Sequence, residues 1–225
     1  MDFIFMLTHG DKTVPNCLDV IDSIKDTGIG HIGFKDIGVG PETLGLLADR
    51  INQAGAVSYL EVVSTTPDAV RESIQNANDI GVSRVLGGQD VAFALATLKR
   101  TGADYYPFPG RPVGHPTRLE GTPDQVAEDC RRMRAAGCPG VDLLAYRATQ
   151  ADPLDLVRAA RSGLGDGYLI VAGSVDSPGQ IRDLAAAGAD AFTVGTAVFD
   201  GSFAAGDGSV AYQCKQILAA CSQPQ

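Results

Sequence analysis

The chain has 225 residues and a formal net charge of −9. This charge argues against nucleic acid or an anionic membrane as a partner, because both require basic patches. No stretch approaches the roughly 20 uninterrupted apolar residues of a membrane span. We therefore expect one globular domain over residues 1–225, at the lower end of the size range of a barrel fold.

The predicted strands are short apolar runs with little alternation, which is typical of parallel strands buried on both faces. In chain order they cover residues 3–7, 31–34, 57–63, 84–87, 104–108, 141–146, 168–173 and 191–195. The first run lacks the basic region and cleavage site of a signal peptide, so we interpret it as a strand.

Most of the predicted helices are marked at one end or at both ends. Proline suits the first position of a helix, and glycine suits the residue just past its end. The expected helix-starting prolines are Pro15, Pro41, Pro67, Pro123, Pro153 and Pro178. The expected helix-ending glycines are Gly28, Gly55, Gly81, Gly102, Gly137, Gly163 and Gly188.

Eight strands alternating with helices predict an α/β fold, a single (β/α)8 TIM barrel. The alternative is an open doubly wound sheet, which would carry a glycine-rich motif after its first strand. The string at 28–33 matches that motif, but it precedes a strand and so does not support the alternative. In a barrel, the active site lies at the C-terminal ends of the strands.

The last two predicted strands favour a phosphate site. They end in Gly173-Ser174 and Gly195-Thr196, where small residues let an anion approach backbone N–H groups. A short extra helix over 196–199 would add further N–H groups. Glycines that only form tight turns are the alternative interpretation.

Over about residues 168–203 the chain resembles the ribulose-phosphate-binding barrels. These include the isomerase and cyclase of histidine biosynthesis, the N-acetylmannosamine-6-phosphate epimerases and the pentose-phosphate epimerases. The resemblance implies that Gly173, Ser174, Gly195 and Thr196 bind the phosphate of a small metabolite.

The second and third strands carry the candidate catalytic residues Lys35, Asp36 and Glu61. Because neighbouring strands lie about 4.8 Å apart, Lys35 and Glu61 can meet and act as an acid–base pair. A structural ion pair, or a Glu61 that faces a helix, is the alternative. The Lys-Asp string also resembles the orotidine-phosphate decarboxylases, but Gly33 stands where their first Asp would be, so decarboxylation is not carried over.

Other candidates lie on predicted loops at the same end of the barrel. The loop over 107–121 is long and proline-rich, and could cover the site or form a subunit contact. The candidates for substrate contact are Asp11, Arg111, His115 and Arg147. His9, Arg118 and Tyr146 are further candidates. Asp142 and His31 are expected to begin strands at the opposite, structural face.

Together these features predict an isomerase or epimerase of a small phosphorylated sugar or sugar acid, without cofactor or catalytic metal. A lyase or aldolase using Lys35 as a Schiff base is the second hypothesis. A non-catalytic phosphometabolite-binding barrel is the third. The five cysteines form no C-x-x-C pair, so we expect reduced thiols and a cytoplasmic protein, with a homo-oligomer possible.

Overall fold

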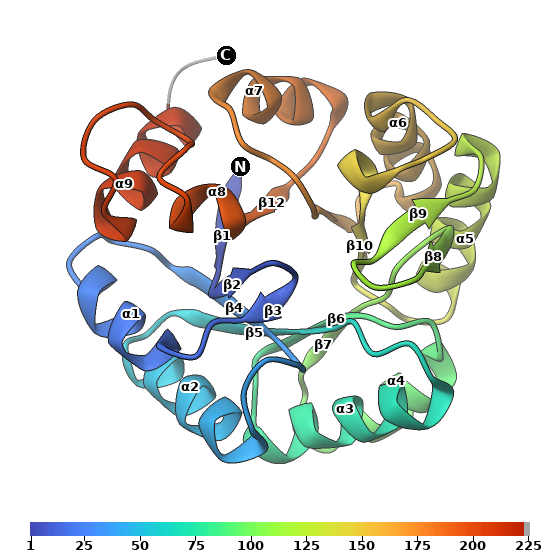
Figure 1. Cartoon of the computed structure of the whole chain (residues 1–225). Coiled ribbons are helices and arrows are strands. Elements are labelled where there is room, and N and C mark those ends of the chain that lie inside the picture. Colours follow the sequence, from blue (N-terminus) through green and yellow to red (C-terminus); the bar gives the residue numbers. More distant parts are fainter. Residues whose placement is uncertain (223–225) are drawn as a thin grey trace.

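The computed structural model describes residues 1–222 and shows a nearly closed barrel of eight parallel strands (Figure 1). The strands follow the order β10-β11-β12-β1-β4-β5-β6-β7. At the seam, the N–H of Asp142 in β10 donates to the carbonyl oxygen of Pro107, just past β7, at 3.1 Å. The bounds are β1 Asp2–Met6, β4 His31–Lys35, β5 Val57–Val62, β6 Arg84–Gly87, β7 Asp104–Tyr106, β10 Gly140–Leu143, β11 Tyr168–Val171 and β12 Ala191–Val194. The predicted (β/α)8 fold is confirmed.

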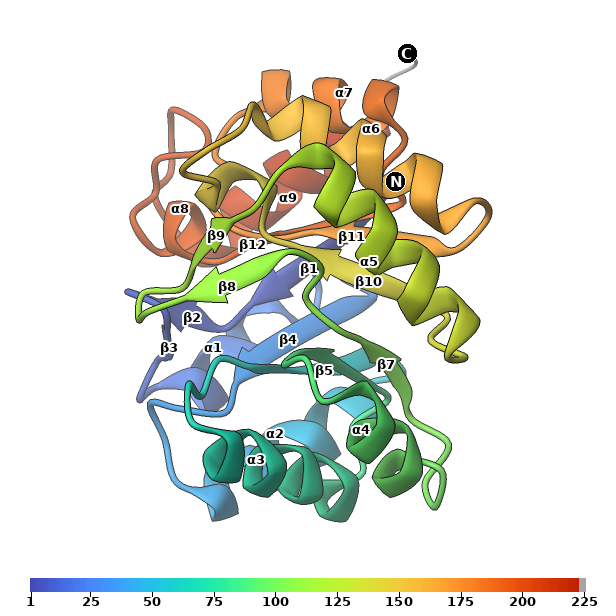
Figure 2. The same cartoon turned by 90° about the vertical axis from the view of Figure 1, so that its right-hand side faces the viewer.

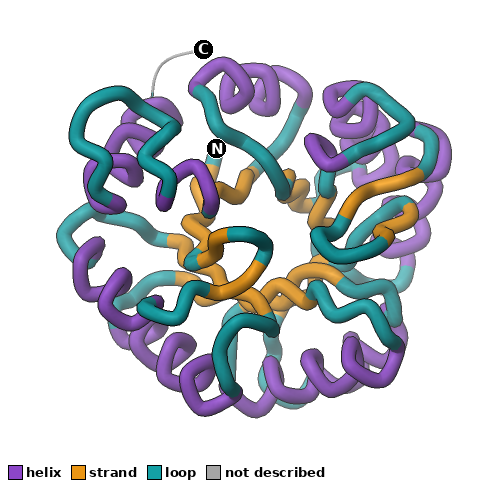
Figure 3. Tube along the Cα trace, viewed as in Figure 1, coloured by secondary structure: helices purple, strands orange, loops and turns teal. Residues whose placement is uncertain are grey.

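Helices surround this ring of strands on the outside (Figure 3). They are α1 Cys17–Ile24, α2 Pro41–Gln53, α3 Pro67–Ile80, α4 Val91–Leu98, α5 Pro123–Ala135, α6 Pro153–Leu164, α7 Pro178–Ala187, α8 Thr196–Phe199 and α9 Val210–Cys221, with a 3-10 turn η1 at Ala145–Arg147. Among residues 1–222 no helix combines the length and apolarity needed to cross a membrane.

The predicted helix signals hold with four exceptions. Gly28 and Gly102 lie four residues beyond the ends of α1 and α4, which end at Ile24 and Leu98. Pro15 lies in the turn before α1, which begins only at Cys17. Gly163 lies inside α6, and Gly165, with a φ of 63°, follows the end of that helix. Gly163 has a packing role instead, because a Cβ there would lie 2.2 Å from the carbonyl oxygen of Ala127 in α5.

Two antiparallel hairpins stand at the C-terminal ends of the barrel strands, on the side where α8 also lies (Figure 2). One pairs β2 (Thr8–His9) with β3 (Lys12–Thr13), and the other pairs β8 (Arg111–Val113) with β9 (Arg118–Glu120). The second hairpin forms the middle of the loop predicted over 107–121, so this loop is an ordered part of the structure.

The core has two parts, because each strand buries both of its faces. The larger part fills the space between the strands and the helices. A smaller part fills the barrel interior with Ile4, Met6, Tyr59, Leu86, Tyr106, Ile170 and Ala191. Interior positions nearer the C-terminal ends of the strands are polar, including Lys35, Glu61 and Asp142, all of them buried. The fold thus places its buried charges where barrel enzymes carry out chemistry.

Candidate active site

A cavity of about 300 Å³ opens at the C-terminal ends of the strands. Its walls combine the two groups that the sequence predicted separately. Lys35 and Glu61 line one part, and Gly173, Ser174, Gly195 and Thr196 line another. A ligand that fills this cavity would therefore contact the candidate acid–base pair and the candidate phosphate site together.

Lys35 and Glu61 are register partners on the adjacent strands β4 and β5. Residues opposite each other in a parallel pair face the same side of the sheet, and here that side is the barrel interior. Lys35 Nζ lies 3.3 Å from Glu61 Oε2, and both side chains are almost fully buried. The prediction that they meet is confirmed, and Glu61 does not face a helix.

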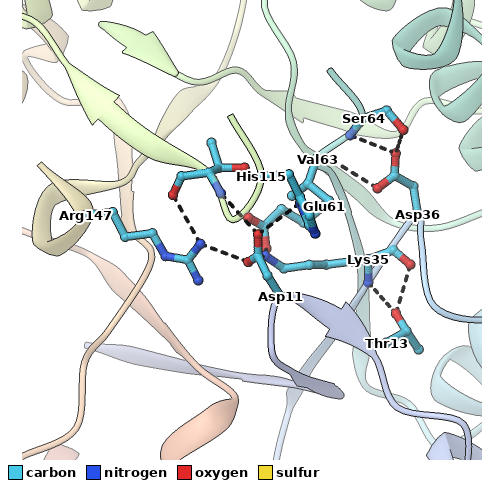
Figure 4. Close-up of polar contacts among 10 residues, drawn as sticks. Asp11, Thr13, Lys35, Asp36, Glu61, Val63, Ser64, His115 and Arg147 are labelled. Atoms are coloured by element: carbon cyan, nitrogen blue, oxygen red, sulfur yellow. Dashed lines mark hydrogen bonds and ion pairs between the residues drawn. The ribbon is translucent and has the colours of Figure 1, made fainter. Parts of the chain in front are cut away.

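Asp11 is the centre of this ion-pair group (Figure 4). Its Oδ1 lies 2.5 Å from Lys35 Nζ and 2.9 Å from an Nη of Arg147. Its Oδ2 accepts the N–H of Thr117 at 3.3 Å and lies 3.5 Å from Nδ1 of His115. Burial alone would raise the pKa of Asp11, but the charges of Lys35 and Arg147 outweigh it and hold the pKa below its usual value.

The β2–β3 hairpin fixes these groups through its backbone. Asp11 has a φ of 66°, a left-handed conformation that Asp adopts more readily than most residues. The hydroxyl of Thr13 donates to the carbonyl oxygen of Lys35 at 2.9 Å and accepts the Lys35 N–H at 2.8 Å. The hairpin is thereby joined to the end of β4, so Asp11 is held directly at the Lys35 ammonium.

The two turns that the sequence assigns to a phosphate have constrained backbones, and the binding of phosphate there stays a prediction. Ser174 has a φ of 56°, uncommon outside glycine, and therefore marks a constrained turn after β11. A Cβ at Gly195 would lie 2.6 Å from Thr8 Oγ1, so only glycine fits beside β2. Thr196 begins α8 directly after Gly195.

The remaining predicted residues divide between the site and the surface. Asp11, His115 and Arg147 join the ion-pair group, from three different connections. Asp36 does not: its carboxylate accepts the N–H of Val63 and the hydroxyls of Ser64 and Ser73, which ties β4 to the loop after β5. Arg111 is exposed and pairs with Glu120 within the β8–β9 hairpin, apart from the cavity.

His9 was a candidate for substrate contact, and Asp142 was expected to begin a strand; the structure places both in other surroundings. His9 pairs at the surface with Asp200, at 2.9 Å. Asp142 does not begin its strand, because β10 starts at Gly140. Its register partner is Ile170, which faces the barrel interior, and Asp142 is fully buried there. The prediction that Asp142 belongs to the structural face was wrong.

Asp142 has electrostatic surroundings unlike those of the other carboxyls. Its pKa is raised well above the usual value, first by burial and then by the negative charge of Glu61, against smaller opposite effects of Lys35 and Arg147. One sequence signal pointed to this position. Gly140 and Asp142 alternate with Val141 and Leu143, a period-2 pattern that places Asp142 on the side opposite the outer core.

Within residues 1–222, no group of three or more His, Cys, Asp or Glu side chains is arranged to hold a metal ion. The cysteines are unpaired thiols, four of them buried: Cys17, Cys130, Cys138 and Cys214, with Cys221 partly exposed. The chemistry assigned to the cavity therefore relies on carboxylates, an ammonium, a guanidinium and backbone N–H groups.

Comparison with known proteins identifies the fold. No family model matches the chain, and a search of curated proteins finds no match. Among solved structures, the native KDPGal structure has a TM-score of 0.70 and 15% identity, over 98% of this chain and 94% of that chain. Orotidine 5′-phosphate decarboxylase from Pyrococcus horikoshii OT3 has a TM-score of 0.64 and 16% identity, over 99% of this chain and 100% of that chain. At such identities the similarity establishes a (β/α)8 barrel and no more.

Proposed function

We propose that this protein is an isomerase or epimerase of a small phosphorylated sugar or sugar acid. The observation that carries the proposal is the placement of the Lys35–Glu61 pair and the backbone turns at Ser174 and Gly195 on one cavity. A substrate anchored by its phosphate at the ends of β11 and β12 would extend towards β4 and β5. There its carbonyl end would meet the buried ion pair.

The phosphate end of the substrate is assigned from backbone geometry. Constrained turns that expose N–H groups bind anions because the groups are fixed in place before the ligand arrives. The turn at Ser174 has the constrained backbone of such a site, and Gly195 directly precedes α8. The similarity to orotidine 5′-phosphate decarboxylase, whose name specifies a phosphorylated substrate, supports the same ligand class.

The reaction assigned to the pair is proton transfer next to a carbonyl group. The Glu61 carboxylate takes a proton from the carbon next to the carbonyl, and the C–H electron pair moves to the carbonyl oxygen to give an enolate. The Lys35 ammonium donates a hydrogen bond to that oxygen and stabilises its charge. In an isomerase, Glu61 returns the proton to the former carbonyl carbon, while the proton of the adjacent hydroxyl group moves to the former carbonyl oxygen. In an epimerase, the Lys35 ammonium gives a proton to the opposite face of the same carbon, and Glu61 keeps the proton that it removed.

An aldolase or lyase is the second candidate, supported by the buried Lys35. A Schiff base needs a free electron pair on the lysine nitrogen. In the structure, Asp11 at 2.5 Å and Glu61 at 3.3 Å both engage the Lys35 ammonium, an arrangement that suits a proton donor better than a nucleophile. A non-catalytic binding barrel remains the third candidate.

The deciding experiment has two stages. A panel of sugar phosphates and phosphorylated sugar acids is first tested for an increase in the melting temperature of the protein. Each compound that binds is then incubated with the protein in D2O, and deuterium uptake at the carbon next to the carbonyl is followed by NMR. Uptake that disappears in Glu61→Gln supports the isomerase or epimerase, whereas cleavage without uptake would replace it by the lyase.

A further inference from the structure

Asp142 is a buried carboxyl that the proposed mechanism does not use. It is fully buried in the barrel interior, and neither carboxyl oxygen has a hydrogen-bond partner among residues 1–222. Its backbone N–H is engaged by Pro107 across the barrel seam, so the position of the residue is fixed. A buried carboxyl without a partner is strongly disfavoured in its charged form.

The charges at the cavity end of the barrel interior balance only when Asp142 is neutral. At the other end, Arg84 lies over the rings of Tyr59, Tyr106 and Tyr168 and pairs with Asp104. At the cavity end, Asp11, Glu61 and Asp142 supply three carboxyls, and Lys35 and Arg147 supply two cations. Both cations contact Asp11, and Lys35 also contacts Glu61, but neither forms an ion pair with Asp142. Two carboxylates neutralise two cations, so a third would leave a net negative charge in a water-excluded space. The raised pKa of Asp142 agrees with this balance.

We propose that Asp142 is a positioning residue of the site, a buried carboxylic acid that stays protonated in the resting protein and holds the cavity ready for an anion. With Asp142 neutral, the ion-pair group has no net charge. An ionised Asp142 would repel both a phosphate group and an enolate. The part of the inference that concerns anion binding rests on the proposed function, but the protonation of Asp142 does not.

Several other groups around Asp142 can titrate, and they must be separated from it. Tyr106 and Tyr168 belong to the strands on either side of β10, with Arg84 over both rings, and their hydroxyls bond to Asp104 and Asp2 respectively. Towards the cavity lie Glu61, Lys35, Arg147 and Asp11, with His115 beside Asp11. Asp176 and Asp200 line the cavity, and Asp200 pairs with the exposed His9. All of them are the same in an Asp142→Asn variant, so the difference between wild type and variant isolates Asp142.

The first test measures stability against pH for the wild type, Asp142→Asn and the exposed control Asp26→Asn. A carboxyl whose folded pKa is raised stabilises the fold most below its unfolded pKa, and this stability is lost as pH rises through the folded pKa. The wild type should therefore lose melting temperature relative to Asp142→Asn by about 3–5 °C per pH unit, starting above about pH 4. The slope of the difference in melting temperature against pH is the deciding quantity, because the amide of Asp142→Asn can shift the melting temperature by the same amount at every pH. Asp142→Ser serves the same purpose if Asp142→Asn does not fold.

The inference would be overturned if the difference in melting temperature between the wild type and Asp142→Asn stayed constant from pH 4 to 8, as expected for the control Asp26→Asn.

The second test uses sulfate, which stays a dianion over this range, and measures its dissociation constant by calorimetry. The wild type should bind sulfate like Asp142→Asn while Asp142 is protonated, and should lose affinity several-fold as pH rises through the folded pKa that the stability curves locate. Parallel affinities would remove the role in anion binding. If sulfate binds neither the wild type nor Asp142→Asn, the phosphate site is rejected. The stability curves would still show whether Asp142 is protonated.

Discussion

The replacement Lys35→Met tests the ion-pair group most directly. Methionine has a similar length, but it removes the ammonium that lies 2.5 Å from Asp11 and 3.3 Å from Glu61. Both carboxylates are nearly inaccessible to water, at 1% and 4% side-chain exposure, so solvent cannot replace the lost cation. Breaking a buried pair by removing one partner costs about 3–5 kcal/mol. For a chain of this size that corresponds to about 6–20 °C in melting temperature.

The loss in Lys35→Met should also depend on pH. In the wild type the pKa of Asp11 is held down, so Asp11 contributes stability that is present above its unfolded pKa and is lost as pH falls through the folded pKa. In Lys35→Met the main cause of that lowering is gone. The difference in stability between the two proteins should therefore be largest near neutral pH and shrink towards pH 3.

The assay combines urea unfolding at several pH values with anion binding and deuterium exchange. The exposed Lys25→Met serves as the control, with an expected change within about 0.5 kcal/mol. If Lys35 also has the proposed catalytic role, Lys35→Met binds the anion and exchanges no deuterium. Normal exchange per folded molecule in a destabilised variant would refute catalysis by Lys35. A variant as stable as Lys25→Met would refute the energetic argument itself.

Three further predictions concern the same cavity. Glu61→Gln should retain sulfate binding, but its rate of deuterium exchange into the substrate should fall by a factor of at least about 100, because a general base is removed. An unchanged exchange rate would exclude that role. Gly195→Ala should weaken sulfate binding, because its Cβ would lie 2.6 Å from Thr8 Oγ1. The control Gly45→Ala should bind sulfate normally, because its Cβ would lie 3.7 Å from the nearest atom. Equal sulfate binding by the two variants would place the phosphate site elsewhere. Borohydride added with a bound substrate should leave the mass of the protein unchanged, and a mass increase at Lys35 would favour the aldolase.

The sequence by itself determined the barrel and the end at which its site lies. Proline before each of five helices and glycine after most of them divide the chain into βα units, and these signals act locally, within one turn of the helix. The meeting of Lys35 and Glu61 was also predictable. The two residues end neighbouring strands, and adjacent parallel strands of a barrel place such positions side by side.

Only the tertiary structure decided how the loops and the barrel interior complete the site. Asp11, Thr117 and Arg147 come from three connections, and nothing in their local spacing determines that Asp11 lies between the other two. Asp36 and Arg111 have the same sequence features as the residues that line the cavity, yet they bond away from it, because the direction of a loop side chain depends on packing. Asp142 has an ionisable side chain, which its residue type shows, but only the barrel topology buries it. Its surroundings arise from strands β4, β5 and β10, which the chain brings together only when the barrel closes.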